Sequence, residues 1–409
     1  MSAMKDENLI DKRASRLKAV THGFFLSITT TIAEPSIILP LIINFFGGSS
    51  LVVGILSSLI KGGAILVQLF AAFGAQSYPR VMPYLRFVFA ARFLAWFGIG
   101  CSIYLFGETR PELTLWCIGI GLFAFSFAAG FGAIYFNEIL GKVFSNAYRG
   151  KVFAQRQFMA GVGAIISGFA AGLLLELYEP PLSFAFLFIL SSFMMLLGVG
   201  AYAMIEEPEK RNVNVKEARF REFVRNAFSL LRSDAQLRRQ IRTYLFAYAH
   251  LLSLPFIILD AESKLGLGGV QVGYLLTVQI AGGMLSNLLW GSMARKGRIR
   301  PIIYTAFGGY IVANIAAISA ESIWQYGAIF FLIGASIDGM RLAFSNNILV
   351  IAPEHQRPVY IALQSNLTSI GLFFAVPGAL ILEQFGYTVL YLVTATLLCA
   401  GAVSARRLL

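Results

Sequence analysis

The sequence predicts an all-α integral membrane protein with twelve transmembrane helices in two pseudo-symmetric six-helix bundles. Three observations predict this fold. Of the 409 residues, 57% are apolar and only 13% are charged. Long apolar runs recur along almost the whole chain, and its two halves resemble each other. Water-soluble domains have roughly 45–50% apolar and about 25% charged residues, so this composition indicates a membrane protein.

Twelve apolar runs are long enough to cross the membrane. A helix needs about 20 residues to span a hydrocarbon core of about 30 Å. The predicted spans are residues 19–46, 50–75, 84–106, 113–140, 152–176, 182–205, 241–261, 269–293, 301–320, 323–351, 358–383 and 386–405.

The distribution of Lys and Arg predicts the orientation, because cytoplasmic loops are enriched in both. With both termini cytoplasmic, 28 of the 33 basic residues lie in cytoplasmic segments or within five residues of the cytoplasmic end of a span, and only Arg110 and Lys264 lie outside. The remaining three, Lys61, Arg92 and Arg341, lie deeper within spans. This asymmetry explains the net charge of +12 without nucleic acid. We expect a monomeric, multi-pass protein of the cell (inner) membrane, in contact with the lipid bilayer.

One long polar stretch divides the chain into a bundle at 1–205, a linker at 206–242 and a bundle at 243–409. Apolar residues in the linker recur at helical spacing opposite a basic face, which predicts an amphipathic helix. That helix either lies on the membrane surface or packs beneath the bundle. The apolar residues are Phe220, Phe223, Val224, Ala227, Phe228 and Leu231.

The two halves share short matching segments in the same order. The matches are 35–40 (PSIILP) with 255–260 (PFIILD), 137–140 (NEIL) with 346–349 (NNIL), and 149–150 (RG) with 357–358 (RP). Parallel six-helix repeats joined by a cytoplasmic linker predict two bundles that move about a site near the membrane midplane.

In this organisation, and in two of its loops, the chain resembles the major facilitator superfamily. Residues 291–298 (GSMARKGR) keep the glycines and basic residues of the superfamily's loop signature but are one residue short, with Arg295 at the Asp position. In the first half, 72–80 (AFGAQSYPR) has Gln76 there. The resemblance implies a secondary transporter, although the Asp-centred charge relay of the cytoplasmic gate is missing in its usual form.

Arginines in the cytoplasmic loops are the candidates for that gate. They either bond carbonyl groups at helix ends when the cytoplasmic side closes, or serve only the orientation of the chain. These residues are Arg80, Arg149, Arg295, Arg298 and Arg357.

No enzymatic or metal site is predicted. The three cysteines lie in apolar runs, no His pair has helical spacing, and no glycine-rich loop precedes a Lys-Ser or Lys-Thr pair. We therefore expect neither an enzyme nor a nucleotide-driven pump, and no cofactor or metal.

Glu34 and Lys61 are the candidate proton-coupling pair. Glu34 lies about 22 Å from the inner end of its span. Pro35 follows it and removes a helical hydrogen bond. Lys61 lies at a similar depth in the second span. Ionised groups at this depth are costly and usually mark a pathway or a pair. The leading hypothesis is proton coupling, and the alternatives are a permanent ion pair and direct substrate contact.

A second set of residues is predicted to line a substrate cavity. Asp338 and Arg341 share one helix face. Either Arg341 binds an anionic group of the substrate, or the two form an internal pair. The resemblance implies that helices 1, 4, 7 and 10 line the cavity, which adds Tyr135, Asn137, Tyr248, His250 and Asn346.

Two other charged residues are expected to be solvated. Arg92 is expected to reach the membrane interface by extending its side chain, and Asp260 to lie exposed near the outer mouth.

We therefore predict a secondary active transporter that moves a small organic solute by alternating access, coupled to protons. The solute is expected to be amphipathic, aromatic or anionic. One alternative is a lipid or lysolipid flippase of the same fold. Another is a transport-inactive membrane receptor or assembly factor, motivated by the missing loop Asp residues.

Overall fold

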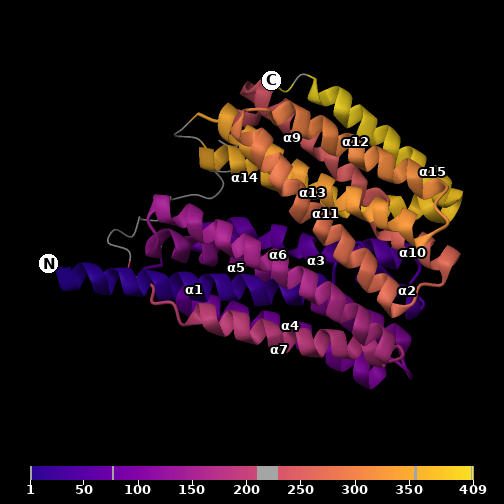
Figure 1. Ribbon diagram of the computed structural model, residues 1–409, viewed down its shortest axis with the longest axis horizontal. Helices are drawn as coiled ribbons and strands as arrows, with labels where there is room; N and C mark the ends of the chain where they lie inside the picture. The colour runs from indigo at the N-terminus through magenta and orange to yellow at the C-terminus, as the bar shows by residue number, and fades with distance from the viewer. Residues whose placement is uncertain (1, 76–77, 210–228, 354–356, 407, 409) are drawn as a thin grey trace. The chain divides into compact units, whose positions relative to one another are not determined.

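The protein is helical throughout the part that the structure describes. The computed structural model describes residues 2–75, 78–209, 229–353, 357–406 and 408, and shows only α and 3-10 helices there (Figure 1). Among these residues, nine helices are long and apolar enough to cross a membrane. Much of the predicted linker, 210–228, lies outside the described residues, so the amphipathic helix is not described.

Each of the twelve predicted spans falls on helix. The unbroken helices are α3 (Ser50–Ala75), α4 (Met82–Phe106), α5 (Pro111–Val143), α6 (Asn146–Leu177), α7 (Leu182–Ala203), α11 (Gly269–Arg295), α12 (Ile299–Ile318) and α13 (Ile323–Ile351). The others are α1 (Ser2–Ile32), α2 (Ile38–Phe45), α9 (Ala235–Ala247), α10 (Leu254–Leu265), α14 (Arg357–Thr368) and α15 (Ala375–Ala405). The last two predicted spans meet within α15, at the non-helical Gly386 (φ 78°).

Three of the spans are interrupted. The first stops at Ile32 and resumes at Ile38, so the bend predicted at Pro35 is a complete break. The seventh passes through a 3-10 segment, η1 (Tyr248–Leu252), between α9 and α10. The eleventh passes through η3 (Ser369–Phe373) between α14 and α15. The breaks in spans 1 and 7 occur in or beside the matching segments of the two halves.

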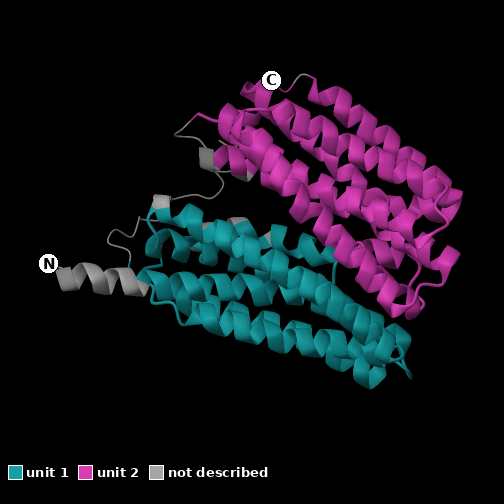
Figure 2. Ribbon diagram, in the orientation of Figure 1, with its two compact units in different colours: residues 1–34, 59–218 teal, residues 35–58, 219–409 magenta. Residues whose placement is uncertain are grey.

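The chain forms two compact units (Figure 2). Unit 1 comprises residues 1–34 and 59–218, and unit 2 comprises 35–58 and 219–409. The break after Ile32 therefore separates α1, in unit 1, from α2, which packs against α10 in unit 2. Ser36 Oγ donates to Gln279 Oε1 of α11 at 2.9 Å, and both side chains are buried.

Unit 1 is built on α1, which packs against α6 and α7, and on α4, which packs against α5 and α7. Trp96 lies at the centre of this packing, with its ring between Phe125 and Phe188, and its Nε1 donates to Ser191 Oγ at 2.9 Å. The indole therefore fills apolar space and also has its polar atom satisfied.

Unit 2 depends on close approach of α11 and α13, with α12 packed against α13 and α15. Glycines allow this approach. A Cβ on Gly334 would lie 1.9 Å from the Gln279 backbone oxygen, and one on Gly282 would lie 2.2 Å from that of Phe331. Small residues of this kind let membrane helices pack closely.

We expect Gly334→Ala to destabilise unit 2 by about 1–3 kcal/mol, because the added methyl group would force two backbones apart. The matched control is Gly308→Ala in α12, where an added Cβ meets nothing within 4 Å. Thermal unfolding of the two purified variants in detergent checks this. Equal melting temperatures would contradict the close-contact explanation.

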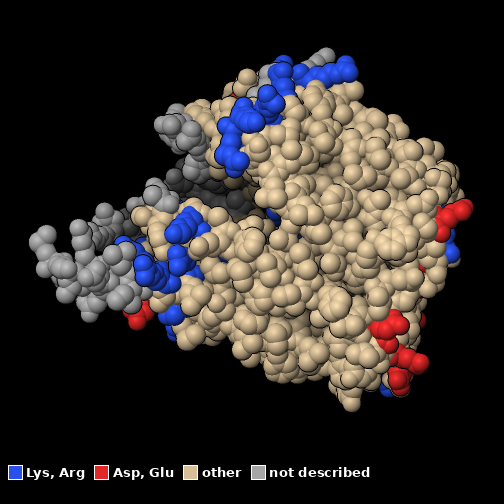
Figure 3. All heavy atoms as spheres, viewed as in Figure 1, with Lys and Arg blue, Asp and Glu red and all other residues tan. Residues whose placement is uncertain are grey.

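In each unit, basic and acidic side chains gather at opposite helix ends (Figure 3). In unit 1, basic residues bind the carbonyl groups at the C-terminal ends of helices. Lys18 Nζ donates to Met204 O at 2.8 Å, and Arg86 Nη2 donates to Ala203 O at 2.9 Å, both at the end of α7. These contacts satisfy carbonyl groups that have no helical partner and complement the helix dipole.

Candidate functional site

Glu34 lies in the break between α1 and α2. Its side chain is half-buried, and its amide donates to Thr31 O at 3.2 Å. The hydroxyl groups of Thr29 and Thr31, at the end of α1, donate to carbonyls of the preceding turn. Hydroxyls that bind the helix in this way help to satisfy polar backbone near the break.

Lys61 is exposed on α3. The ion pairs found among the described residues do not join it to Glu34. The two residues predicted to work together both lie in unit 1.

Unit 2 brings several predicted cavity residues together around aromatic rings. The His250 ring in η1 stacks on Tyr310 of α12, with centroids 4.5 Å apart and planes at 9°. Tyr248 lies 5.3 Å from Tyr244, measured between ring centroids, and Tyr244 stacks on Phe344 of α13 at 4.3 Å. His250 Nδ1 bonds Ala247 O at 2.7 Å, so one ring nitrogen is held by the backbone.

Asp338 and Arg341 form the ion pair that their spacing suggests. Arg341 Nη2 lies 2.8 Å from Asp338 Oδ1, and Asn287 Nδ2 of α11 donates to Asp338 Oδ2 at 2.6 Å. The Arg341 side chain is 57% exposed, against 17% for Asp338. Asp338 is therefore held on both sides, whereas much of the guanidinium is accessible.

Asn346 donates to Leu342 O of its own helix at 2.8 Å. Its neighbour Asn347 is fully buried and donates to Gln240 Oε1 of α9 at 2.7 Å. Gln240 Nε2 in turn donates to Gln364 Oε1 of α14 at 2.8 Å. This chain of amides joins α9, α13 and α14, and its partners are too far apart in sequence to be predicted.

The predicted cavity residues of unit 1 differ in exposure. Tyr135 of α5 is buried beside Phe131 and Tyr84, and Asn137 is exposed. Tyr135 and Asn137 lie in one unit, whereas Tyr248, His250, Asp338, Arg341 and Asn346 lie in the other.

The predicted gate arginines make different contacts. Arg149 Nη2 donates to Gly141 O at 3.0 Å and to Phe144 O at 3.2 Å, at the end of α5. Arg80 pairs with Glu209 at 3.3 Å on the surface. Arg295 and Arg298 are exposed at the end of α11. Arg357 begins α14, but its side chain lies outside the described residues, as does Gln76.

A buried carboxylate that the sequence did not reveal lies next to the loop at 78–81. The Glu207 carboxylate accepts from Val81 N at 2.9 Å, from Met82 N at 2.7 Å and from Lys142 Nζ at 2.5 Å. It binds the N-terminal end of α4, where a negative charge is favourable. Glu207 thus ties α4 and α5 to the end of α7.

Asp260 is buried, so the expectation that it is solvated is wrong. Its Oδ2 accepts from Lys264 Nζ at 3.0 Å, Tyr326 OH at 2.9 Å and Tyr391 OH at 3.1 Å. Its side chain is only 3% exposed. The hydroxyl donors come from α13 and α15, far from Asp260 in sequence, and they make burial of the charge tolerable.

Asp234 caps α9 and links it to α14. Its Oδ1 accepts from Gln236 N at 2.8 Å and Leu237 N at 3.0 Å, and Tyr360 OH donates to Oδ2. Partial burial raises the pKa of Asp234, but the bonds from Tyr360 and the two amides lower it more, so the net pKa lies below 3.8. The ionised cap is therefore favoured in the folded protein.

We expect Asp234→Ala to lower stability by about 1 kcal/mol at neutral pH, as loss of an N-cap does. Because the folded pKa of Asp234 is depressed, its contribution is complete above the unfolded pKa and disappears as the pH falls through the folded value. The difference in melting temperature from the native protein should therefore shrink below pH 3.8. The control is Ser233→Ala, since Ser233 is exposed and bonds only Leu230 O; an equal loss in both variants would contradict the cap.

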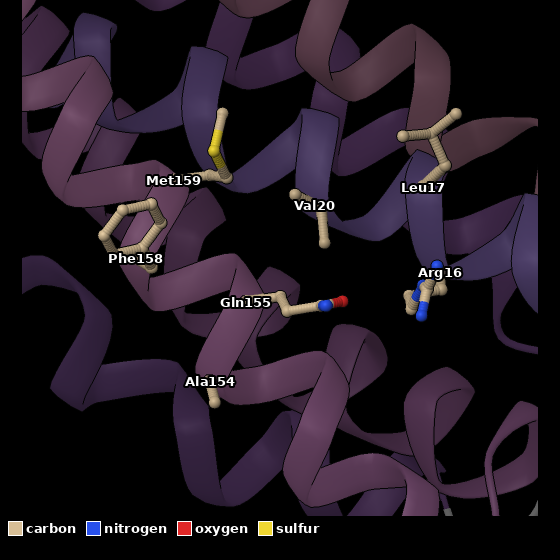
Figure 4. Close-up of a pocket in the computed structure, with 7 residues that line it drawn as sticks. All are labelled: Arg16, Leu17, Val20, Ala154, Gln155, Phe158 and Met159. Carbon is tan, nitrogen blue, oxygen red and sulfur yellow. The ribbon is translucent and has the colours of Figure 1, made fainter.

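A surface groove of about 480 Å³ runs between α1 and α6 in unit 1 (Figure 4). Its lining is mostly apolar and includes the exposed side chains of Leu17 and Phe158. Such a lining suits the hydrocarbon chains of lipids, and we assign no solute to it. In the part of the chain that the structure describes, no group of three His, Cys, Asp or Glu side chains is arranged to hold a metal ion.

Comparison with known proteins gives one family match, in the C-terminal part of the chain. Residues 243–409 match the family model described as the Major Facilitator Superfamily. No curated protein matches the chain.

Solved structures share the fold over almost the whole chain. A mutant of the nucleoside transporter NupG superposes with a TM-score of 0.72 at 12% identity, covering 96% of this chain and 99% of that one. A bacterial homologue of the iron transporter ferroportin gives 0.71 at 14% identity, covering 98% of each chain. A D-xylose-proton symporter gives 0.71 at 10% identity, covering 97% of each chain. All three are transporters rather than enzymes.

Proposed function

We propose that the chain belongs to the Major Facilitator Superfamily and that it moves a small organic solute across the membrane by alternating access, coupled to protons. The family and the fold support secondary transport, and they carry this part of the proposal. The solute and the coupling ion are proposed from the residues of this chain. We also propose that the protein lies in the cell (inner) membrane with both termini cytoplasmic.

The observation that carries the mechanism is the pair of broken helices in or beside the matching segments of the two halves. The first break contains Glu34, and the second, η1, contains Tyr248 and His250. Non-helical backbone at membrane depth is tolerated only where protein buries it or where it lines a water-filled cavity. Discontinuous helices are the usual place for substrate and ion sites in transporters.

We assign the coupling proton to Glu34. Its carboxyl group lies at the point where α1 ends and is half-buried, so its surroundings change if the break moves. A carboxyl group that alternates between burial and water changes its proton affinity, because burial disfavours the charged form. Lys61 is exposed and makes no ion pair with Glu34 in the described chain; in this proposal it acts as a charge partner only in another conformation.

We expect Glu34→Gln to abolish solute uptake driven by a pH gradient while leaving counterflow exchange intact, because exchange needs no net proton movement. The assay is uptake into proteoliposomes of a solute first found by thermal-shift screening at pH 5.5 and 7.5. Glu112→Gln is the control, since Glu112 is exposed in the first turn of α5. Gradient-driven uptake at the native rate in Glu34→Gln would refute the assignment.

We propose that the solute is aromatic or amphipathic and carries an anionic group. The rings of Tyr244, Tyr248, His250 and Tyr310 form a continuous aromatic cluster in unit 2, in which Tyr310 is buried and the other three are partly exposed. Such rings stack on flat or apolar groups. The exposed guanidinium of Arg341 offers a fork of donors suited to a carboxylate or phosphate.

We expect Arg341→Met to weaken binding of an anionic solute by about tenfold, a loss of about 1.4 kcal/mol, while a neutral analogue keeps its affinity. Ligand-induced stabilisation of the purified protein measures both affinities. The control is Arg300→Met at an exposed position in α12. An equal loss for charged and neutral solutes would indicate instead that the pair of Asp338 and Arg341 is structural.

The missing loop Asp residues do not exclude transport. In unit 1, the Glu207 carboxylate binds backbone amides beside the loop and the Lys142 ammonium. We propose that Glu207 supplies the negative charge that the loop sequence lacks. The gate role of Arg80, Arg149, Arg295, Arg298 and Arg357 is retained as part of this proposal.

A further inference from the structure

Three basic side chains of unit 1 have buried nitrogen atoms that make no hydrogen bond within the described part of the chain. His22 of α1 is 3% exposed and Arg92 of α4 is 7% exposed, which corrects the expectation that Arg92 reaches the interface. Arg156 of α6 is partly buried. Both ring nitrogens of His22, Nε of Arg92 and Nε of Arg156 are buried and make no hydrogen bond within the described chain.

The three groups are close to one another. The ring centroid of Phe89, one helical turn from Arg92 on α4, lies 5.6 Å from that of His22. The ring of Phe136 lies 5.3 Å from the His22 ring centroid, and Arg156 Cζ lies 4.8 Å from the same ring. They come from three helices, α1, α4 and α6, so the grouping is a tertiary feature.

Gly23 explains how Arg156 reaches this position. A Cβ on Gly23 would lie 2.5 Å from Arg156 Cγ. The side chain of Arg156 therefore crosses α1 where α1 has no side chain, directly beside His22. Any larger residue at 23 would displace it.

Aromatic rings compensate these cations only in part. Arg92 Cζ lies 4.4 Å from the centroid of Phe125, and Arg156 lies over Phe136. A desolvated cation is attracted to the face of an aromatic ring. Stacking uses the face of the guanidinium and leaves the N–H groups at its edge without acceptors.

No carboxylate neutralises the cluster within the described residues. None of the ion pairs there includes Arg92 or Arg156. The nearby Glu207 is already bound by Lys142 and by two backbone amides. A buried arginine without a counter-charge is costly, because a buried charge needs both a partner and hydrogen bonds.

We propose that unit 1 holds a small inorganic anion of the halide class, bound by N–H groups of Arg92, Arg156 and His22 as a resident counter-ion. Three aromatic rings lie with centroids 5.0–5.6 Å from that of His22. Packing this close favours a monatomic ion such as chloride over a carboxylate or phosphate. The site stabilises unit 1 and does not depend on which solute is transported.

The test is thermal unfolding of the full-length protein in detergent, with sodium chloride replacing sodium gluconate at constant ionic strength. We expect a saturating rise in melting temperature of several degrees, since a ligand that binds only the folded state stabilises it. Equilibrium dialysis with radioactive chloride should show one bound ion per chain. Absence of a chloride-specific rise in the native protein would overturn the proposal.

Variants separate this site from general salt effects. Arg156→Met should raise the chloride concentration for half-saturation at least tenfold, and Arg92→Met should do the same if it folds. If Arg92→Met does not fold, Arg92→Lys replaces it, because lysine keeps the charge but lacks the guanidinium fork. Arg92→Lys should weaken chloride binding less than Arg156→Met does. Arg86→Met is the control, because Arg86 is exposed on α4 and bonds only Ala203 O; its chloride response should equal that of the native protein.

Two other outcomes decide against a halide. An equal chloride response in the native protein and in Arg156→Met would mean that the ion binds elsewhere. Stabilisation by sodium acetate or phosphate, lost in Arg156→Met, with no response to chloride, would show that the cluster binds oxyanions instead.

Discussion

The constraint on which this structure depends is that every backbone N–H and C=O group in hydrocarbon must be satisfied by the protein itself. Continuous helices meet it directly, and they make up most of the chain. A break leaves several groups without helical partners, so it persists only where other groups bind them or where water has access. The interruptions at 33–37, η1 and η3 are therefore the least expected parts of the fold, and two of them contain candidate functional residues.

The hydrocarbon of the membrane also determines how the helices pack against one another. Hydrocarbon gives little hydrophobic drive for helices to associate, so close backbone contact and polar bonds between helices hold the units together. Gly334 against Gln279 is a backbone contact of this kind. The buried amides of Gln240, Asn347 and Gln364 are polar bonds of this kind.

Buried charges are compensated in two ways. Asp260 and Glu207 each receive several hydrogen bonds as well as a lysine. Arg92 and Arg156 instead stack on aromatic rings and have no anionic partner in the described chain. The first arrangement is complete within the protein, whereas the second requires something beyond it. The ion pair in unit 2 is intermediate between these two arrangements. Asp338 is bound by both Arg341 and Asn287, whereas the Arg341 side chain stays accessible.

Length and hydropathy alone determined the helical class and the places of all twelve predicted spans, because a span is a local property of about 20 consecutive residues. The i, i+3 spacing placed Asp338 and Arg341 on one helix face, and their ion pair was one of the two alternatives that it left open. Contacts between helices were decided only by the tertiary structure. The burial of Asp260 was not predicted, because its hydrogen-bond donors Tyr326 and Tyr391 lie on helices distant in sequence. The burial of Arg92 was not predicted either, because no neighbouring residue in the sequence indicates it. The break in span 7 and the partners of Glu207 could not be predicted for the same reason. Burial and hydrogen bonding depend on which distant segments come into contact, and the hydropathy of the sequence does not determine those contacts.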